Sequence, residues 1–510
     1  MPTNDNLSNI HHLTWRDKRY KQFYQIVDQL VKEIQDHVWI GTGKKKRRVR
    51  NADLAKLTYS VECIIRDCMV VVYGRKRAGE TTIYRGQYYY GSSRPDQMLT
   101  YKIHIKRAFD GLLELGYLRI TKDGFHAREP NPDYNVTSQL TRYVAGSRLI
   151  SLFKDSIDVL PAIIPPYIDP EPIKIQSKGN DELGILRRFR HTFDDTPASD
   201  KMLENLSFIN KSLSKNWYDL DLDQRGLHEL AVKRAPKGKP PRPVNFNRRF
   251  VHRIFGDINL ESGGRFYGGW WEDLPKDYRK HILINGKRTV ELDYSSMHPQ
   301  IVYALAGKKM TEDAYSEFLL PKKFPKGSYN FDEDPMADFR IMIKRSLNSM
   351  LNSEKETTRP PRKRKKKDYN PSDFGLTWKE VKGAILEFHH PIKEYFFSGL
   401  GGKLQRLDSH IAEETILHFA RKNIPVLPVH DSFIMHHGYE NELRDVMGQT
   451  FKKVIGESAD IRIDKKERKI SVMKDSDELA DEFEDDSWLT EYLNRGHEKR
   501  LMAFRQLSHA

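Results

Sequence analysis

Val-Glu-Leu-Asp-Tyr-Ser-Ser-Met-His-Pro-Gln-Ile, residues 290–301, marks a change from strand to helix. On its N-terminal side two mainly apolar runs, 281–284 and 289–292, flank Asn285-Gly286. This dipeptide tolerates the positive φ angles of a tight turn. The sequence therefore predicts a β-hairpin whose second strand ends near Asp293.

The C-terminal side of the same stretch is typical of a helix. Pro299 suits the first turn, and apolar residues recur at helical spacing at Met297, Ile301 and Leu305. Ser295 or Ser296 can cap this helix. Asp293 then lies at a strand end with its side chain facing a cleft; the alternative is an aspartate that only caps the helix.

A second acid lies in a similar setting near the C-terminus, in Val-Leu-Pro-Val-His-Asp-Ser-Phe-Ile-Met (426–435). Two short apolar runs flank a polar tip, which predicts a hairpin with Asp431 at its apex. Two carboxylates brought together can hold two Mg²⁺ ions, which clamp the attacking and leaving oxygens of an in-line phosphoryl transfer. Asp293 and Asp431 are therefore the predicted catalytic and metal-binding residues, with Mn²⁺ as a possible substitute ion.

A helix with its own chemistry is predicted between the two acids. Asp334-Pro335 supplies a cap and a first-turn proline, and an apolar stripe follows at Met336, Phe339, Ile343, Leu347 and Met350. Arg340, Lys344 and Asn348 recur every fourth residue on another face. Cations one turn apart suit a nucleoside triphosphate, whose charge must be held during transfer. The alternative is a solvated basic face.

The order of the three segments resembles motifs A, B and C of template-dependent polymerases with a right-hand palm. It is most similar to family A DNA polymerases and single-subunit RNA polymerases, over about residues 255–470. Asp293-Tyr294-Ser295 resembles motif A, Arg340-x3-Lys344 resembles motif B, and His430-Asp431 resembles motif C. Residues 296–301 and Asn348-Ser349 are also similar to family B patterns. The resemblance implies a palm, fingers and thumb, with Arg340, Lys344 and Asn348 binding the nucleotide.

Two positions depart from family A. Asn352-Ser353 stands where family A has Tyr-Gly, and Ser432 stands where its DNA polymerases have Glu after the motif C aspartate. His430-Asp431-Ser432-Phe433 is instead close to the form in single-subunit phage RNA polymerases. His298, five residues after the first acid, is the residue expected to contact the nucleotide sugar. DNA polymerases of these families carry a bulky residue there that excludes the ribose 2′-OH, so we expect deoxynucleotides.

Further nucleic-acid contacts are expected from an aromatic, glycine-rich segment, 263–271. Glycines let a backbone approach a ligand closely, while cationic and aromatic side chains grip phosphates and stack on bases. The resemblance places Gly264-Arg265 in a template- and primer-binding segment, and Gln405, Arg406 and Asp408 near a primer end. The predicted nucleic-acid-binding set is Gly264, Arg265, Tyr267, Trp270, Gln405, Arg406 and His430. An aromatic hairpin packed on the palm is the alternative for 263–271.

Composition agrees with a polyanionic partner. The 510 residues carry a formal net charge of +15, and nucleic acid is the commonest polyanion bound by such proteins. Two cysteines, Cys63 and Cys68, indicate neither a zinc site nor a disulfide framework. With no run of about 18 apolar residues, we expect no membrane association and a cytoplasmic, nucleoid-associated location.

Five regions are expected along this α/β (α+β) chain. Residues 1–160 form a mostly helical, nucleic-acid-binding region similar to a winged helix, because an amphipathic helix at 99–115 leads into a hairpin with a glycine turn at 122–125. Residues 161–180 form a proline-rich linker. The remaining regions are a thumb-like helical region at 181–250, a palm and fingers core at 251–475, and an acidic then helical tail at 476–510.

These features predict a template-dependent DNA polymerase that adds deoxynucleoside triphosphates to a primer on a DNA template. No Asp-x-Glu motif with matching downstream acids, which would indicate an exonuclease, is evident in residues 1–250, and no Walker A motif occurs. Resemblance suggests a mobile element or phage as the source. One alternative is a single-subunit RNA polymerase or primase; another is a non-catalytic, winged-helix replication initiator.

Overall fold

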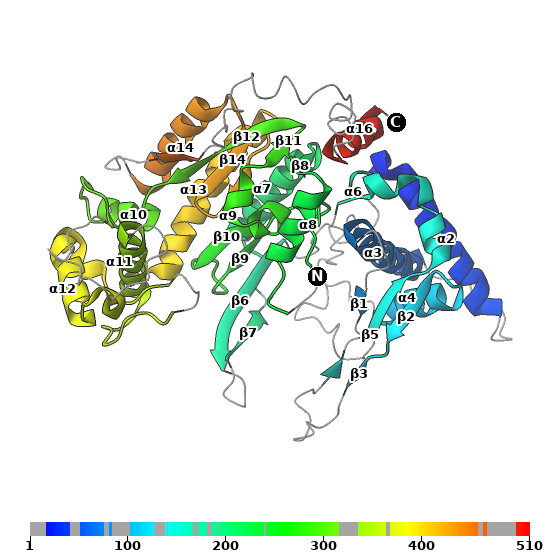
Figure 1. The fold of residues 1–510 in the computed structure, drawn as a ribbon, viewed down its shortest axis with the longest axis horizontal. Helices are drawn as coiled ribbons and strands as arrows, with labels where there is room; N and C mark the ends of the chain where they lie inside the picture. The colour runs from blue at the N-terminus through cyan, green and yellow to red at the C-terminus, as the bar shows by residue number, and fades with distance from the viewer. Residues whose placement is uncertain are drawn as a thin grey trace, which may run out of the picture.

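The computed structural model describes residues 17–40, 51–75, 81–83, 102–126, 138–139, 141–166, 172–180, 186–191, 193–238, 241–315, 335–363, 368–456, 463–466 and 496–509. They form a mixed α/β fold with several sheets. One hydrophobic cluster gathers residues between Tyr20 and Ile164, and a larger one gathers residues between Ala162 and Phe504. In Figure 1 the N-terminal unit lies on one side of the central sheets, and α11 and α12 lie on the other.

The N-terminal unit packs helices on a small antiparallel sheet. Its helices are η1 (Lys18–Tyr20), α2 (Lys21–Ile40), α3 (Asn51–Arg75), α4 (Lys102–Glu114), α5 (Ser147–Ser151), η2 (Lys154–Val159) and α6 (Leu160–Ile163). Its sheet has the order β1 (Thr81–Ile83), β5 (Thr141–Ala145), β2 (Leu118–Lys122). In α2, Phe23, Val27 and Leu30 are buried at the spacing of an amphipathic helix.

The hairpin after α4 differs from the predicted tight glycine turn. β2 pairs with β5, with Leu118 opposite Ala145, while β3 (Phe125–His126) pairs with β4 (Ser138–Gln139). Tyr143 and Ala145 are buried in the same cluster as Leu118. Burial of these partners sets the strand pairing, so the turn at 122–125 was wrongly predicted, although the helix before it is confirmed.

The central sheet carries both predicted acid motifs. Its order is β13 (Leu427–Val429), β14 (Ser432–His436), β12 (Lys287–Tyr294), β11 (Ile282–Ile284), β8 (Tyr218–Leu220), and β15 (Ile463–Lys466) also pairs with β12. Asn285 and Gly286 have φ angles of +53° and +81°, so the β11–β12 hairpin is confirmed. Two helices pack on this sheet, α13 (Gly401–Arg421) and α14 (Glu440–Ile455), and α10 (Met297–Leu305) packs against both of them.

A second sheet lies where the sequence predicted a linker and a helix. Its order is β10 (Gly263–Tyr267), β9 (His252–Phe255), β6 (Ile173–Asn180), β7 (Leu186–His191). Ile173 and Ile175 are buried with the two-residue period of a strand. The linker at 161–180 and a purely helical region from 181 were therefore wrong. Helices α7 (Pro197–Ser214) and α8 (Gln224–Lys233) confirm the helical prediction in part, but between them Tyr218–Leu220 forms β8 of the central sheet.

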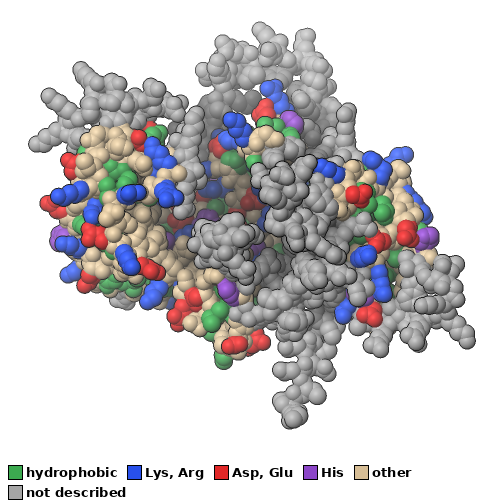
Figure 2. Space-filling model, turned by 90° about the horizontal axis from the view of Figure 1, so that it is seen from below, with side chains coloured by type: hydrophobic (Ala, Val, Ile, Leu, Met, Phe, Trp, Pro, Cys, Tyr) green, Lys and Arg blue, Asp and Glu red, His purple; other side chains and the backbone are tan. Residues whose placement is uncertain are grey.

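A helical lobe stands beside the central sheet. It contains α11 (Pro335–Asn352), η4 (Pro371–Phe374), α12 (Trp378–Phe388) and η5 (His390–Tyr395). α11 buries Phe339, Ile343 and Leu347, as predicted. Figure 2 shows Lys and Arg side chains spread over this lobe among Asp and Glu.

Two short helices, η3 (Trp270–Asp273) and α9 (Lys276–Arg279), follow β10, and α16 (Gly496–His509) ends the described chain. Residues 364–367 and the acidic part of the predicted tail, 476–495, lie outside the described residues. Among the helices that the structure describes, none combines the length and apolar character needed to cross a bilayer.

Helix α16 joins the two hydrophobic clusters through a buried ion pair. Arg500 donates from Nε to Asp219 Oδ2 at 2.8 Å and from Nη2 to Asp219 Oδ1 at 2.6 Å. It also donates to the Tyr73 hydroxyl of α3 at 2.6 Å. Trp217 Nε1 donates to Asp219 as well, at 2.8 Å. Arg500 and Asp219 are only 1% and 2% exposed.

We expect Arg500→Ala to lower the free energy of unfolding by about 3–5 kcal/mol, because it leaves the Asp219 carboxylate buried without its cation. Urea unfolding would measure the change. Lys499→Ala, at the exposed neighbouring position of α16, is the control and should change stability by less than about 0.5 kcal/mol. Equal unfolding midpoints for the two variants would contradict the assigned role of the pair.

Candidate active site

The ladder between β12 and β14 brings the two predicted acids to one point. Asp293 lies directly opposite Ser432, and Tyr294 N donates to Asp431 O at 3.3 Å. The β13–β14 hairpin turns through His430 and Asp431, with His430 at a φ angle of +59°. Asp293 lies within β12 and both acids are partly exposed. The alternative of an aspartate that only caps a helix is therefore wrong.

The helix that follows Asp293 begins without the predicted serine cap. Ser296 occupies the N-cap position, but its φ angle is +55° and its side chain makes no capping hydrogen bond. At the start of the helix, Gln300 N instead donates a main-chain hydrogen bond to Ser296 O at 3.1 Å. Pro299 lies in the first turn, as predicted. This start of α10 brings His298 beside Arg265.

A buried glutamate lies on the same strand face as Asp293. Arg279 donates to Glu291 from Nε at 3.0 Å and from Nη2 at 2.8 Å. Ser432 Oγ donates to Glu291 Oε1 at 2.8 Å and to Val429 O at 3.1 Å. Ser432 thus ties the second acid hairpin to a glutamate on the first acid strand.

Three elements meet at a buried aspartate beside the acids. Asp408 of α13, 1% exposed, accepts from Arg265 of β10, whose Nε lies 3.1 Å from Oδ1 and 3.0 Å from Oδ2. The His298 Nε2 lies 2.8 Å from Asp408 Oδ2 and 3.1 Å from Arg265 Nη2. Burial lowers the pKa of Arg265, but the hydrogen bonds and charge of Asp408, together with Asp431, outweigh it and raise that pKa. Arg265 therefore stays charged beside the acids.

A row of rings continues from the second acid. The ring of Tyr267 lies 5.7 Å from that of His430 and 6.4 Å from that of His252, measured between centroids. Desolvation lowers the pKa of His430, Arg265 adds to the decrease, and Asp431 opposes it. His430 is accordingly a neutral ring near pH 7, suited to packing against a base or sugar.

The cationic helix α11 faces the acids across a buried tyrosine. Arg340 Cζ and Lys344 Nζ lie 5.1 and 5.6 Å from the ring centroid of Tyr315. Burial raises the pKa of Tyr315, and Asp431 contributes to the increase through its charge. Arg340 is also ion-paired with Asp313. The structure thus gathers Asp431, Tyr315 and the two predicted cations into one region.

The third predicted residue of α11, Asn348, is partly buried. Its Oδ1 is buried and has no hydrogen-bond partner within the described part of the chain. Its main-chain oxygen accepts from Asn352 Nδ2 at 2.6 Å. An unsatisfied buried acceptor is costly in a native protein, so Asn348 is a position at which a bound donor would be favourable.

Two other residues predicted to bind nucleic acid have structural roles instead. Trp270 is 1% exposed and packs on Phe246, 5.1 Å away between ring centroids. It presents no face for stacking on a base, so its prediction was wrong and the packed-hairpin alternative holds for that side chain. Gly264 has a φ angle of +86°, and a Cβ there would lie 2.5 Å from the Phe255 ring. Packing therefore requires this glycine.

The two predicted residues of α13 are partly buried. Arg406 donates from Nε to Leu260 O at 3.0 Å and so ties α13 to the loop before β10. Burial lowers the pKa of Arg406, and Glu413 and Asp257 oppose that decrease. Gln405 precedes Arg406 on the same helix. Asp408, which follows shortly after them, is the residue of α13 that reaches the site.

Sequence reasoning missed Glu291 and Tyr315, which carry no motif signal. Asp408 was expected near a primer end, and Arg279 at a phosphate or in solvent, but their partners Arg265 and Glu291 were not predicted. The register of β15 adds a further acidic position, since Asp464 lies opposite Asp293. Alternation in Ile461-Arg462-Ile463-Asp464 is the one sequence signal that could have suggested this strand.

The donors present suit Mg²⁺. Mg²⁺ is commonly bound through one or two carboxylates, with water and substrate phosphates completing its shell. Asp293 and Asp431 supply two carboxylates at adjoining strand positions. Among the residues that the structure describes, no group of three or more His, Cys, Asp or Glu side chains could hold a metal ion. An ion here would therefore depend on these two acids and on bound phosphate.

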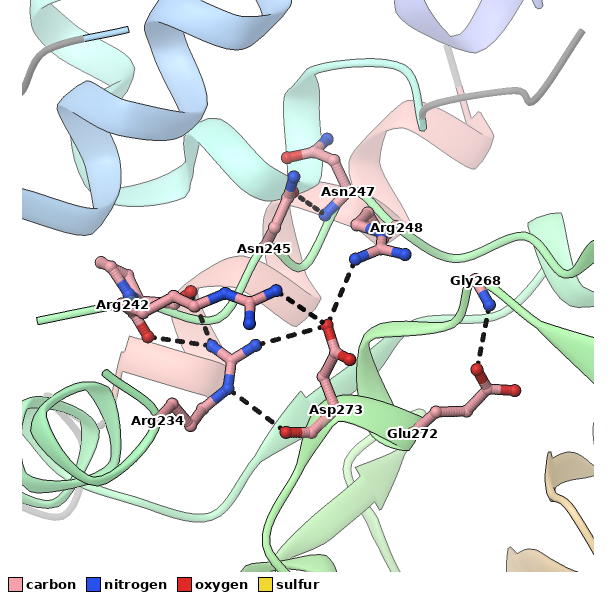
Figure 3. A network of polar contacts seen from close by, with 9 residues as sticks. Arg234, Arg242, Asn245, Asn247, Arg248, Gly268, Glu272 and Asp273 are labelled. Carbon is pink, nitrogen blue, oxygen red and sulfur yellow. Dashed lines mark hydrogen bonds and ion pairs between the residues drawn. The ribbon is translucent and has the colours of Figure 1, made fainter. Parts of the chain in front are cut away.

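Beyond Tyr267 lies an arginine cluster, drawn in Figure 3. Asp273 Oδ2 accepts from Arg242 Nη2 at 3.3 Å and Arg248 Nη1 at 3.2 Å, and Arg234 Nη2 lies 3.7 Å away. Three guanidinium groups on one carboxylate leave a local excess of positive charge. Arg242 and Arg248 are 57% and 37% exposed, so that charge faces solvent.

The neighbouring Glu272 is held in a different electrostatic state. Gly268 N donates to its Oε2 at 2.9 Å, and its Oε1 is buried without a partner in the described region. Burial raises the pKa of Glu272 well above its usual range, although the Gly268 hydrogen bond opposes the increase. Glu272 is thus a carboxyl that the fold favours in its protonated form.

We expect Glu272→Gln to stabilise the protein at pH 8 by more than about 1 kcal/mol and to have little effect near pH 4. A raised folded-state pKa means that stability is lost as pH rises above the unfolded pKa of about 4.3, and glutamine removes this loss. Urea unfolding at both pH values would measure it. Glu261→Gln, at an exposed position, is the control; an effect of Glu272→Gln that does not change with pH would contradict the expected protonation.

No protein-family model matches this chain, and no curated protein matches it. Function must therefore be inferred from the chain's own residues and contacts.

Proposed function

We propose that this protein is a template-dependent DNA polymerase that transfers nucleotides from deoxynucleoside triphosphates to a primer 3′-OH. The observation that carries the proposal is the convergence of three segments distant in sequence. Asp293 and Asp431 lie on adjoining strands, and Arg340 and Lys344 of α11 approach the same region across Tyr315. Carboxylates for metal and cations for triphosphate are the two requirements of this chemistry.

In this proposal Asp293 and Asp431 hold two Mg²⁺ ions, or Mn²⁺ in their place. Bound metal would activate the primer 3′-OH and stabilise the leaving pyrophosphate. Arg340 and Lys344 bind the triphosphate and neutralise its charge. Arg265 remains charged beside Asp431 and is suited to a phosphate or base edge of the primer-template.

The right-hand architecture belongs to the same proposal. The β13-β14-β12-β11-β8 sheet would be the palm, and the lobe of α11 and α12 the fingers. The thumb, expected by position at 181–250, would include α7 and α8, although α7 packs on α13 beneath the second sheet. The N-terminal unit, in which α2, α3 and α4 pack together beside the β1-β5-β2 sheet, would be the winged-helix-like region and would bind DNA.

His298 supports deoxynucleotide use. Its ring is fixed by Asp408 and Arg265 at 2.8 and 3.1 Å, and it stands at the position that meets the sugar in the resembling families. A fixed ring excludes a 2′-OH better than a mobile one. The sequence His430-Asp431-Ser432-Phe433 favours a second candidate, an RNA polymerase or primase, which preference for ribonucleotides would support.

Asp293→Ala and Asp431→Ala should each reduce extension of a labelled primer on a DNA template, with Mg²⁺ and deoxynucleotides, by about 10³-fold or more. Loss of either carboxylate removes a ligand from the metal pair. Asp445→Ala, at an exposed position of α14, is the control and should retain activity. Wild-type protein that binds DNA but extends neither primed nor unprimed template would point to the non-catalytic initiator instead.

His298→Ala should raise the ratio of ribonucleotide to deoxynucleotide kcat/KM by about 10- to 100-fold, the range for a steric contact worth about 1–3 kcal/mol. Single-nucleotide incorporation of ATP and dATP would measure the ratio, which cancels any general loss of activity. Asp408→Asn keeps the ring but weakens its hold and should give a smaller increase. An unchanged ratio in His298→Ala would remove His298 from sugar selection.

A further inference from the structure

The arginine cluster of Figure 3 is built on one buried guanidinium. Arg234 follows α8, and its side chain is 5% exposed. Its Nη1 donates to Arg242 O at 3.0 Å and to Pro243 O at 2.7 Å, and its Nε donates to Asp273 O at 3.4 Å. Arg234 therefore joins the end of α8, the segment after it and η3 through main-chain acceptors.

The backbone that carries the two exposed arginines is also held in place. Arg242 N donates to Ala231 O of α8 at 2.8 Å, and Arg248 N donates to Asn245 O at 3.0 Å. Arg248 O accepts from Trp270 N of η3 at 2.9 Å. Both guanidinium groups thus extend from fixed main-chain positions toward the same carboxylate, as Figure 3 shows.

Most N–H donors of these two arginines are left for solvent or a ligand. Arg242 donates to Asp273 Oδ2 from Nη2 at 3.3 Å, and Arg248 donates to the same oxygen from Nη1 at 3.2 Å. Within the described part of the chain, neither side chain makes another hydrogen bond or ion pair. A guanidinium has five N–H donors. Two forks with unused donors therefore lie side by side above one carboxylate oxygen.

The charges of the cluster do not balance. Three guanidinium groups surround one carboxylate, which leaves a formal excess of two positive charges. The neighbouring Glu272 does not offset them, because burial raises its pKa well above the usual range and favours the uncharged form. Burial lowers the pKa of Arg234, and the charges of the other two arginines lower it further, while Asp273 opposes the decrease. The cluster is therefore short of negative charge.

Stability alone is a poor explanation for this arrangement. An exposed ion pair contributes little to stability, and one guanidinium is sufficient to neutralise a carboxylate. Lys233, which precedes Arg234, forms such a one-to-one pair with Asp277. Asp273, in contrast, is 38% exposed and has three cations around it. Gathering like charges costs free energy, and a bound anion would offset that cost.

We propose that the arginine cluster binds a terminal phosphate group, with Arg242 and Arg248 as its direct ligands. A terminal phosphate carries a charge of about −1.5 to −2 at pH 7 and has three acceptor oxygens. It matches the excess positive charge and the paired guanidinium forks. The internal phosphodiester of a nucleic-acid backbone carries a single negative charge and matches them less well. Asp273, fixed by Arg234, keeps the two forks directed to one place.

Two sources present this group: the 5′-phosphorylated end of a nucleic-acid strand, and inorganic phosphate or a small phosphate ester. The cluster directly follows β10, where Tyr267 contacts the His430 ring of the candidate active site and Gly268 N donates to Glu272. This connection favours the strand end. Binding of a phosphate group does not rest on the proposed polymerase activity, whereas the choice of a strand end does.

Wild-type protein tests the proposal without any substitution. Two 3′-labelled strands of about ten thymidines, one with a 5′-phosphate and one with a 5′-hydroxyl, would be compared by fluorescence anisotropy in EDTA at about 100 mM salt. We expect the phosphorylated strand to bind at least about tenfold more tightly, since its terminal group gains charge-assisted hydrogen bonds from two arginines. Binding of inorganic phosphate up to about 10 mM would be measured separately by isothermal titration calorimetry.

Two variants with the same loss of charge assign the binding to the cluster. Arg242→Gln with Arg248→Gln removes both direct ligands, and Arg225→Gln with Arg421→Gln makes the same changes at exposed positions of α8 and α13. We expect the first variant to bind the two strands within about twofold of each other, and the second to retain the wild-type preference. Each preference is a ratio measured on one protein, so a general loss of affinity or of folded protein cancels.

The outcomes separate the two sources and the polymerase function. A preference for the phosphorylated strand that is lost only in the cluster variant supports a strand end. Equal affinities for the two strands, with binding of inorganic phosphate that is lost in the cluster variant, support a small phosphate. Absence of both effects in the wild type, or an equal loss in both variants, would overturn the proposal. No metal or deoxynucleotide is present, so a wild-type protein that shows the preference but extends no primer would overturn only the polymerase function.

Discussion

The antiparallel register between β12 and β14 is the constraint on which the candidate site depends. Asp293 faces the cleft only because Leu292 and Val290 face the core, opposite Phe433 and Met435. Side chains alternate along a strand, so a slip of one residue would exchange the two sets. A shifted register that buried the Asp293 carboxylate would cost more free energy than the shifted strand pairing could supply. The apolar residues between the acids therefore fix the acids themselves.

Buried ion pairs then set where the surrounding elements meet this sheet. Asp408 joins β10 and α10 to α13, and Arg253 with Glu413 joins β9 to α13. Such pairs add little net stability over apolar packing, since desolvation offsets their attraction. Removing one partner is costly, however, because the other charge stays buried. These pairs therefore determine how α13 packs on β9 and β10. An alternative packing of α13 would leave two carboxylates and two guanidinium groups without partners.

Local sequence determined the parts of this fold that depend on neighbouring residues. Asn285-Gly286 specified its hairpin, and the spacing of Phe339, Ile343 and Leu347 specified α11. The same reasoning placed Asp293 and Asp431 at strand ends, because each follows or interrupts short apolar runs. The β13–β14 hairpin could be predicted for the same reason.

Pairings between distant residues could not be obtained in that way. β6 binds β9 in parallel, and nothing local in residues 161–180 distinguishes such a strand from a linker. Arg265 and Asp408 are 143 positions apart, so their contact depends on the packing of α13. Trp270 failed for a related reason, since an aromatic ring near glycines is compatible with either a binding surface or a core until its neighbours are known.

The two acids create a negative electrostatic potential, and the cations of the site offset it. Two carboxylates repel the polyanion on which they would act, and the local field must be reversed by cations. Arg265, Arg279 and Arg340 each have an acidic partner, Asp408, Glu291 and Asp313 respectively. An acid behind a guanidinium reduces its net charge but fixes its planar fork in one direction, and a fixed dipole or charge needs no reorganisation when substrate charge develops. Lys344, with no such planar fork, depends instead on the ring of Tyr315 for its direction. In this arrangement each guanidinium contributes less net positive charge but holds a fixed orientation. Transfer of a phosphoryl group requires charge with a fixed orientation.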